Sequence, residues 1–239
     1  MLYRIGLGLN RDGITQEGKS AIKSCKKIYL ESYTVDFPYS IEELEKSLGK
    51  SIVSIGRNEV ESDKLVNESK KENIALLVYG SPLFATTHSS ILVDCARAHV
   101  KTQVIYSASV FDAVACSGLQ LYKFGKITSM PKWIAGKFTP ESFIDIVKEN
   151  ESIKAHSLIL CDIGLAFNDS LNELEASAKN KKVKLEKIIV CSRLGTENSK
   201  IFYNTIQNLK NKKVLMPFCI IVPSDMHFAE KEALENAAK

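Results

Sequence analysis

Short apolar runs alternate with longer amphipathic stretches in the first half of the chain. The apolar runs, rich in β-branched residues, are typical of strands and fall at 2–7, 27–31, 52–55, 74–79 and 103–106. Apolar residues at helical spacing occur at 15–24, 41–48, 60–72, 89–99 and 110–119. Because strands that alternate with helices pair into a mostly parallel, helix-covered sheet, this half predicts an α/β domain.

A second series of elements begins near Lys126. It predicts strands at 127–130, 157–162, 187–192 and 214–222 and a helix at 170–179. Thr139 followed by Pro140 predicts a further helix start, with Thr139 as its N-cap. The stretch 122–126 resembles a join, so we expect two α/β domains, residues 1–122 and 123–239.

Composition narrows the class of protein. The 239 residues are 45% apolar and 25% charged, which is typical of a folded globular chain. There is no apolar run of membrane-spanning length and no secretory leader pattern, so we expect a cytoplasmic protein. The net charge of +4 is dispersed, apart from lysines near 179–182, and predicts no nucleic-acid surface. Six scattered cysteines without metal-ligand spacing predict small buried side chains and no metal site.

The loop after the first strand carries Gly6 and Gly8. Two glycines permit a tight turn and close approach of a ligand to the backbone, although a plain turn would need them too. The dinucleotide fingerprint requires a third glycine where Arg11 stands, which disfavours NAD.

Polar residues also follow later strands. Residues 80–88 combine a Gly-x-Pro turn with hydroxyls and His88, which suits either a ligand-binding loop or a helix-capping segment. Neither Ser81 nor Thr86 lies in a nucleophile elbow. Ser109 precedes a predicted helix, where it serves either as an ordinary cap or beside a bound anion. Asp162 and residues 192–195 close two further buried strands.

Several of these segments together resemble a known family. Residues 5–9, 80–88, 108–110, 118–125 and 140–143 are similar, in order and spacing, to the diphthine synthase family of tetrapyrrole-methylase-like methyltransferases. The resemblance runs from residue 2 to about 163 and resumes around Arg193 and at 220–223 with His227. It implies two α/β domains with the cofactor in the cleft between them, usually in a homodimer.

The resemblance also implies an activity. Family members transfer methyl groups from S-adenosylmethionine, leaving S-adenosylhomocysteine, to the amino nitrogen of a modified histidine on elongation factor 2 in diphthamide biosynthesis. Three transfers give the trimethylammonium, and eukaryotic members add a methyl ester. The stretch 109–122 looks closer to eukaryotic members, so we expect ester formation too.

The residues that occupy cofactor-contact positions by this resemblance are Leu9, Ser81, Phe84, Ser109, Val110, Cys161, Leu194 and Phe218. No side-chain base is implied, because positioning supplies most of the catalysis of such a transfer. Three features depart from the family pattern: Ser81 stands where Asp is usual, the region 166–182 is shorter, and Ser224-Asp225 replaces Gly-Lys. Two alternatives are a tetrapyrrole methyltransferase and a binding module of the same fold that has lost catalysis.

Overall fold

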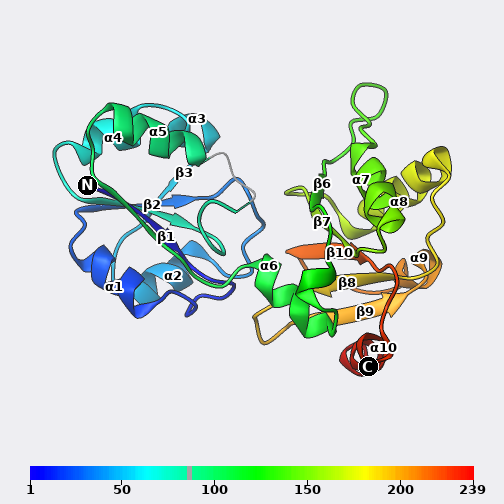
Figure 1. The fold of residues 1–239 in the computed structure, drawn as a ribbon. Coiled ribbons are helices and arrows are strands. Elements are labelled where there is room, and N and C mark those ends of the chain that lie inside the picture. The colour runs from blue at the N-terminus through cyan, green and yellow to red at the C-terminus, as the bar shows by residue number, and fades with distance from the viewer. Residues whose placement is uncertain (85–87) are drawn as a thin grey trace. The chain divides into compact units, whose positions relative to one another are not determined.

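A computed structural model describes residues 1–84 and 88–239, and Thr86 and Thr87 of the polar loop lie outside the described residues. The chain forms two compact units, Met1–Val110 and Phe111–Lys239 (Figure 1). This division precedes the expected join at 122/123. The short helix η1 (Val114–Ser117) explains the difference, because it packs against elements of the second unit.

The first unit is built on a five-stranded parallel sheet. Its strands are β1 (Leu2–Gly6), β2 (Lys27–Glu31), β3 (Val53–Ile55), β4 (Ile74–Val78) and β5 (Thr102–Ile105), in the order β3-β2-β4-β1-β5. Every residue of β4 is buried, as expected for an interior strand covered on both faces. The predicted parallel sheet is confirmed here.

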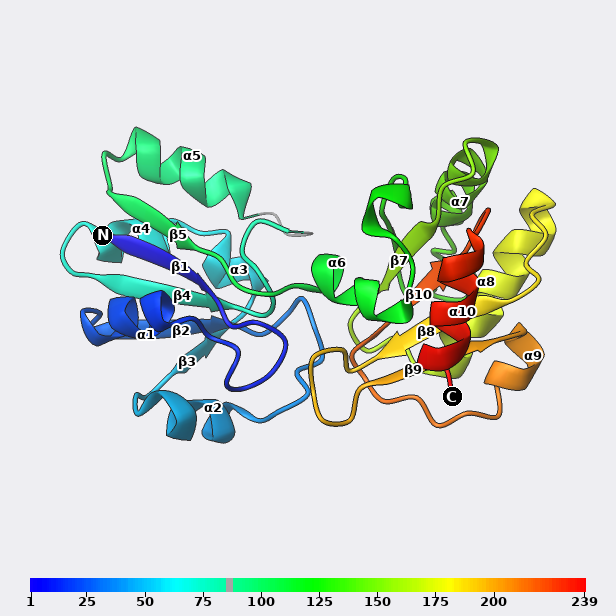
Figure 2. The same ribbon diagram turned by 60° about the horizontal axis from the view of Figure 1, so that its bottom comes forward.

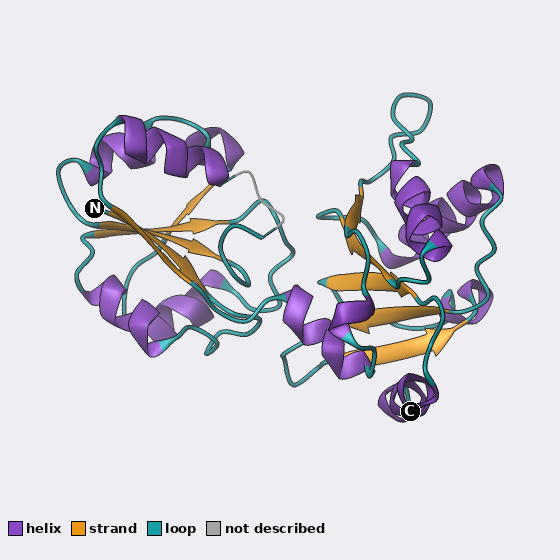
Figure 3. Ribbon diagram, in the orientation of Figure 1, coloured by secondary structure: helices purple, strands orange, loops and turns teal. Residues whose placement is uncertain are grey.

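Helices cover both faces of this sheet (Figure 3). On one face lie α1 (Gln16–Lys23) and α2 (Ile41–Leu48); on the other lie α3 (Arg57–Val60), α4 (Lys64–Ser69) and α5 (Ser89–Arg97). Figure 2 shows α5 and α2 on opposite sides of the sheet. Because alternate strand residues point to opposite faces, β1, β2 and β4 each contribute to both cores.

The predicted helix at 60–72 is instead two short helices. Ser62 breaks it, because its hydroxyl donates to the Glu59 carbonyl at 2.7 Å and accepts from the Lys64 N–H at 3.3 Å. Such local bonds compete with the helical pattern. Thr15 caps α1 as predicted, accepting from the Gly18 N–H.

The sheet of the second unit is mainly antiparallel, in contrast to the parallel sheet of the first unit. Its strands are β6 (Thr128–Met130), β7 (Ser157–Cys161), β8 (Ile188–Ser192), β9 (Lys200–Asn204) and β10 (Phe218–Val222), in the order β6-β7-β10-β8-β9. Only β6 and β7 pair in parallel. The connection from β8 to β9 contains no helix, and a short connection joins antiparallel neighbours.

Helices lie on both sides of this sheet as well. The larger core is formed with α7 (Ser142–Ser152), α8 (Phe167–Lys181) and α9 (Ile206–Leu209). On the other side lie η1 and α10 (Phe228–Ala237), while α6 (Val110–Ala113) precedes η1 and η2 (Leu121–Lys123) follows it (Figure 1). No helix within 1–84 or 88–239 is long and apolar enough to span a membrane.

The predicted helix start at Thr139 is wrong. Helix α7 begins at Ser142 with Glu141 as its N-cap residue. The preceding residues belong to a hairpin, in which the Trp133 indole N–H donates to the Pro140 carbonyl at 3.0 Å and Ile134 pairs with Phe138. Because these residues pair within the hairpin, the helix begins at Ser142 and not at Thr139.

Candidate functional site

The loops that follow β1, β4 and β5 meet at one edge of the first unit, because these strands are neighbours in the sheet. Gly8 and Gly80 exchange two backbone hydrogen bonds of 3.0 Å each. Both have positive φ, +69° at Gly8 and +73° at Gly80, a conformation that favours glycine. Gly8 and Gly80 therefore join the loop after β1 to the loop after β4, and this pair is called the glycine joint.

The same edge leaves no space for larger residues near Gly6. A Cβ at Gly6 would lie 2.6 Å from the Gly80 carbonyl oxygen and 3.0 Å from Ser107 Cβ. The Ser107 hydroxyl donates to the Gly13 carbonyl at 2.8 Å, which ties the loop after β5 to the loop after β1. All three loops are thus held by close contacts that the sequence encodes in small residues.

This edge carries the five predicted contact residues of the first unit. Leu9, Ser81 and Ser109 are buried, Val110 is half-buried, and Phe84 is 43% exposed. A Cβ on Gly80 would touch Ser109 Cα at 3.8 Å, so the segments carrying Ser81 and Ser109 are adjacent. The structure therefore brings together residues from positions 9, 81 and 109.

The other three predicted residues share one end of the sheet in the second unit. Cys161 ends β7 and Phe218 begins β10, its antiparallel neighbour. Phe218 also pairs with Ser192, two residues before Leu194, and the Arg193 N–H donates to the Pro217 carbonyl at 2.8 Å. The Phe218 ring packs edge-on against another ring at 5.4 Å between centroids. These three residues form a mainly apolar edge.

Acidic groups flank this apolar edge. Burial raises the pKa of the Cys161 thiol, which keeps it protonated at neutral pH and unsuited to act as a nucleophile. Burial also raises the pKa of Glu173, whose Oε1 accepts from the Trp133 N–H at 3.0 Å. Asp162 accepts from the Ile163 N–H at 3.0 Å and the Lys132 N–H at 3.3 Å, so it organises its own loop. The sequence offers no reason to single out Glu173 as a residue beside this edge, because the helical pattern around it does not indicate that it is buried.

Comparison with known proteins identifies relatives along nearly the whole chain. Residues 1–210 match the family model of the tetrapyrrole (corrin/porphyrin) methylases. The chain is 31% identical over 268 residues to the diphthine methyl ester synthase of Schizosaccharomyces pombe, covering 100% of this chain and 94% of that protein. It is 34% identical over 250 residues to the diphthine synthase of Methanococcus aeolicus, covering 98% and 97%. A crystal structure of diphthine synthase superposes with a TM-score of 0.91 at 30% identity, covering 99% of this chain and 95% of that one.

The chain belongs to the diphthine synthase family.

Membership in the diphthine synthase family makes the chain a methyltransferase with two α/β domains, as the resemblance implied. The predicted cofactor contacts fall on one edge of each unit. The individual roles of these residues remain predictions.

In this diphthine synthase family member, the polar loop after β4 ends in the protein interior. His88 is fully buried, with its Nε2 2.5 Å from Oε2 of the equally buried Glu31, although the two groups lack hydrogen-bond alignment. The His88 carbonyl accepts from buried Arg4 at 3.5 Å, and burial lowers the pKa of that guanidinium. His88 is therefore a core histidine that anchors the start of α5, not a group exposed at the loop's mouth.

A second buried network fixes the segment 120–125, which belongs to the diphthine synthase family pattern. The Glu230 carboxylate accepts from the Gln120 N–H at 3.0 Å, the His227 N–H at 2.8 Å and the Lys123 ammonium at 2.6 Å. His156 lies 3.2 Å from the same carboxylate, and its Nδ1 accepts from the Ser224 N–H at 2.9 Å. His156 is therefore neutral, with the proton on Nε2. The sequence showed no pattern linking these distant residues.

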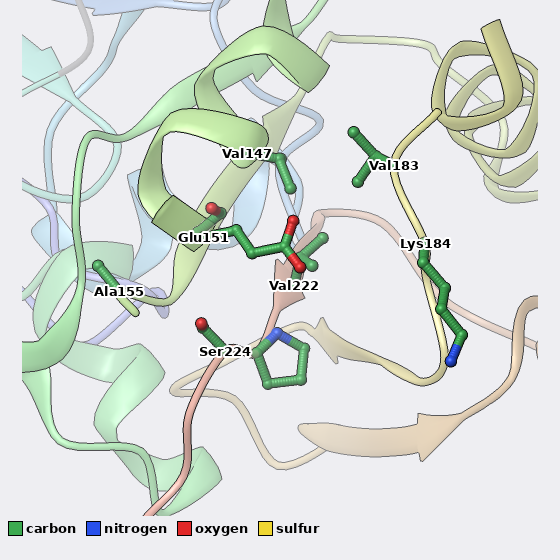
Figure 4. A pocket seen from close by; sticks show the side chains of 9 residues that line it. Val147, Glu151, Ala155, Val183, Lys184, Val222 and Ser224 are labelled. Carbon is green, nitrogen blue, oxygen red and sulfur yellow. The ribbon is translucent and has the colours of Figure 1, made fainter. Parts of the chain in front are cut away.

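A small cavity of about 50 Å³ lies at the far end of the second unit's sheet (Figure 4). Its lining includes Ser157, Val222 and Ser224, together with Glu151 and Lys184. Ser157 and Val222 are at the opposite ends of β7 and β10 from Cys161 and Phe218. This cavity is therefore not where the diphthine synthase resemblance puts the cofactor.

Proposed function

We propose that this protein transfers methyl groups from S-adenosylmethionine to the amino nitrogen of the modified histidine of elongation factor 2, in diphthamide biosynthesis. The observation that carries the proposal is similarity along nearly the whole chain to proteins named diphthine synthase and diphthine methyl ester synthase. The shared fold and the glycine-built edge of the first unit support it.

The eight predicted contact residues fit this cofactor. Leu9, Leu194 and Phe218 are apolar side chains suited to an adenine ring. The hydroxyls of Ser81 and Ser109 and the backbone groups around Gly8 and Gly80 suit a ribose and an amino acid head. None of the eight is charged, so Ser81 leaves the position without the carboxylate usual in the family.

S-adenosylmethionine, when bound, supplies a methyl group on a positively charged sulfur. The protein's task is then to hold the substrate amine in line with the bond that breaks, and positioning of this kind supplies most of the rate enhancement. The predicted contact residues contain no general base, and the protonated Cys161 thiol is not one. Deprotonation of the amine is therefore assigned to solvent.

We further propose that transfer continues beyond trimethylation to the methyl ester and that the working form is a homodimer. The relatives from Schizosaccharomyces pombe and Mus musculus, each 31% identical, are named diphthine methyl ester synthases. Light scattering coupled to gel filtration tests the dimer, and a monomer at micromolar concentration would contradict it.

Intact-protein mass spectrometry tests the proposed activity. Elongation factor 2 carrying the unmethylated precursor is incubated with this protein and S-adenosylmethionine, and a mass gain of four methyl groups is expected. A mass gain of three methyl groups would contradict only the proposed ester formation. No gain, alongside turnover of a porphyrinogen, would favour the tetrapyrrole alternative. Elongation factor 2 that lacks the precursor group on its histidine is the matched control and should gain nothing.

A further inference from the structure

A tyrosine at the end of β4 holds the loop after β1. The Tyr79 hydroxyl donates to the Leu9 carbonyl at 3.0 Å, between residues 70 positions apart in the sequence. The next residue, Gly80, pairs through its backbone with Gly8. Two consecutive residues of one loop therefore bind two consecutive residues of the other, once through a side chain and once through the backbone.

The tyrosine ring is itself fixed by an aromatic cluster. Its centroid lies 5.3 Å from that of Phe37 at an interplanar angle of 75°, and 6.4 Å from that of Tyr39. Phe37 and Tyr39 also pack edge-on, at 5.6 Å. Edge-on aromatic contacts of this kind are favourable and restrict the rings. The hydroxyl of Tyr79 is thus presented to Leu9 from a restrained position.

The bond selects one orientation of the peptide between Leu9 and Asn10. Because a trans peptide is planar, its N–H points opposite to its C=O. With the carbonyl turned toward Tyr79, the Asn10 N–H faces the other side of the loop. Rotation of this peptide would exchange a donor for an acceptor on each side, which would alter any ligand contact made by the backbone.

We propose that Tyr79 is a positioning residue for the cofactor, acting through the Leu9 carbonyl. The inference rests on the proposed function, because Leu9 is a predicted contact of S-adenosylmethionine. Tyr79 holds the loop in its binding conformation before the ligand arrives, so its hydroxyl lowers the cost of ordering the loop on binding.

The aromatic cluster provides a matched control. Tyr39 belongs to the same cluster, but its buried hydroxyl has no hydrogen-bond partner within residues 1–84 and 88–239. Burial raises the pKa of Tyr39, so its phenol is protonated at neutral pH. Tyr79→Phe and Tyr39→Phe each remove one oxygen and retain the ring. Only the first removes a bond to the loop after β1.

Calorimetric titration of the full chain with S-adenosylhomocysteine tests the inference. Tyr79→Phe should raise the Kd about five- to tenfold, as expected for one lost hydrogen bond of about 1–1.4 kcal/mol. Tyr39→Phe should stay within about twofold of the parent. In methyl-transfer assays, Tyr79→Phe should raise KM for S-adenosylmethionine and leave kcat at saturating cofactor almost unchanged. A residue that only stabilises the fold would lower the melting temperature without this separation of KM from kcat.

Hydrogen exchange of the amides of residues 8–13 is the second measurement, made without ligand. Faster exchange in Tyr79→Phe but not in Tyr39→Phe supports the inference. It is overturned if Tyr79→Phe binds S-adenosylhomocysteine like the parent, or if both variants weaken binding equally. A parent protein that does not bind S-adenosylhomocysteine at all contradicts the proposed function instead.

Discussion

The two units each bury a histidine beside a glutamate, and they treat the pair differently. In the second unit, Glu230 accepts from three separate groups as well as facing His156, and the histidine's other nitrogen is bonded too. In the first unit, Glu31 and His88 lie in contact, but Glu31 Oε1 and His88 Nδ1 have no partner among the described residues. The second unit thus fixes its segments with a saturated polar network, whereas the first unit relies on glycine-permitted backbone contacts. Sequence patterns therefore reveal the glycine-permitted contacts of the first unit better than the polar network of the second unit.

Removal of the Glu230 carboxylate should have the largest effect. Glu230→Ala leaves the Lys123 ammonium and two backbone N–H groups without their buried acceptor, and we expect a loss of about 3–5 kcal/mol in the free energy of unfolding. Denaturant unfolding measures it. Glu232→Ala, an exposed neighbour on the same helix, is the control and should change stability by less than about 0.5 kcal/mol. Equal effects of the two substitutions would show that the network contributes nothing.

The same network predicts loss of stability in acid. Burial opposes ionisation of Glu230, but the hydrogen bonds from Gln120, Lys123 and His227 outweigh it and lower its pKa to about 2. Burial also lowers the pKa of His156. Both groups therefore bind fewer protons folded than unfolded, so stability is present above their unfolded pKa values, about 6.5 for His and 4.3 for Glu. It is lost as the pH falls from there toward 2.

Denaturant midpoints measured between pH 7 and pH 3 check this dependence. The parent midpoint should fall across this range, and Glu230→Gln should flatten the lower part of the curve because it removes the carboxyl that titrates there. A variant curve parallel to the parent's would rule out Glu230 as its source.

Disruption of the His88–Glu31 pair should lower the free energy of unfolding by less than the loss of Glu230. His88→Ala removes an imidazole that is in contact with Glu31 but not fully hydrogen-bonded, and we expect a loss of about 2–3 kcal/mol from the cavity and the buried carboxylate. Thermal and denaturant unfolding of this variant and Glu230→Ala give the order directly. A larger loss for His88→Ala would reverse the contrast between the two units.

Substitution of the glycine joint should act on binding in the first unit. In Gly8→Val the side chain would have to tolerate a φ of +69° and a Cβ 2.9 Å from the Gly13 carbonyl oxygen. We expect the Kd for S-adenosylhomocysteine to rise at least about tenfold. Calorimetry tests this, with NAD as the ligand that should not bind. A folded variant with parental affinity would exclude this loop from the site.

The smallest effect is expected at Ser81. Ser81→Asp restores the carboxylate usual in the family, next to a cofactor that carries positive charge. Because Ser81 is only 4% exposed, the cost of burying the carboxylate offsets most of the gain from its attraction to the cofactor. We therefore expect the Kd for S-adenosylmethionine, measured by calorimetry, to fall about threefold. Tenfold weaker binding would mean that the loop is rebuilt around the serine.

Much of the first unit was predictable from the sequence. Its strands are short runs rich in apolar residues, and Gly6, Gly8 and Gly80 mark the places where the loops approach one another. In the second unit, β9 was missed because Lys200–Asn204 is a partly exposed edge strand without strong apolar alternation. Networks such as His156 with Glu230 connect residues 74 positions apart, and no local pattern encodes such a distance. Tyr79 was likewise invisible, since its role lies in one hydrogen bond to Leu9.

The most direct test of the proposed function is tandem mass spectrometry of elongation factor 2 after reaction with S-adenosylmethionine whose methyl group carries deuterium. We predict labelled methyl groups on the amino nitrogen of the modified histidine, and a further one on its carboxyl group as the ester. Labelled methyl groups at other residues, or none with a parent protein that binds the cofactor, would contradict the proposed function.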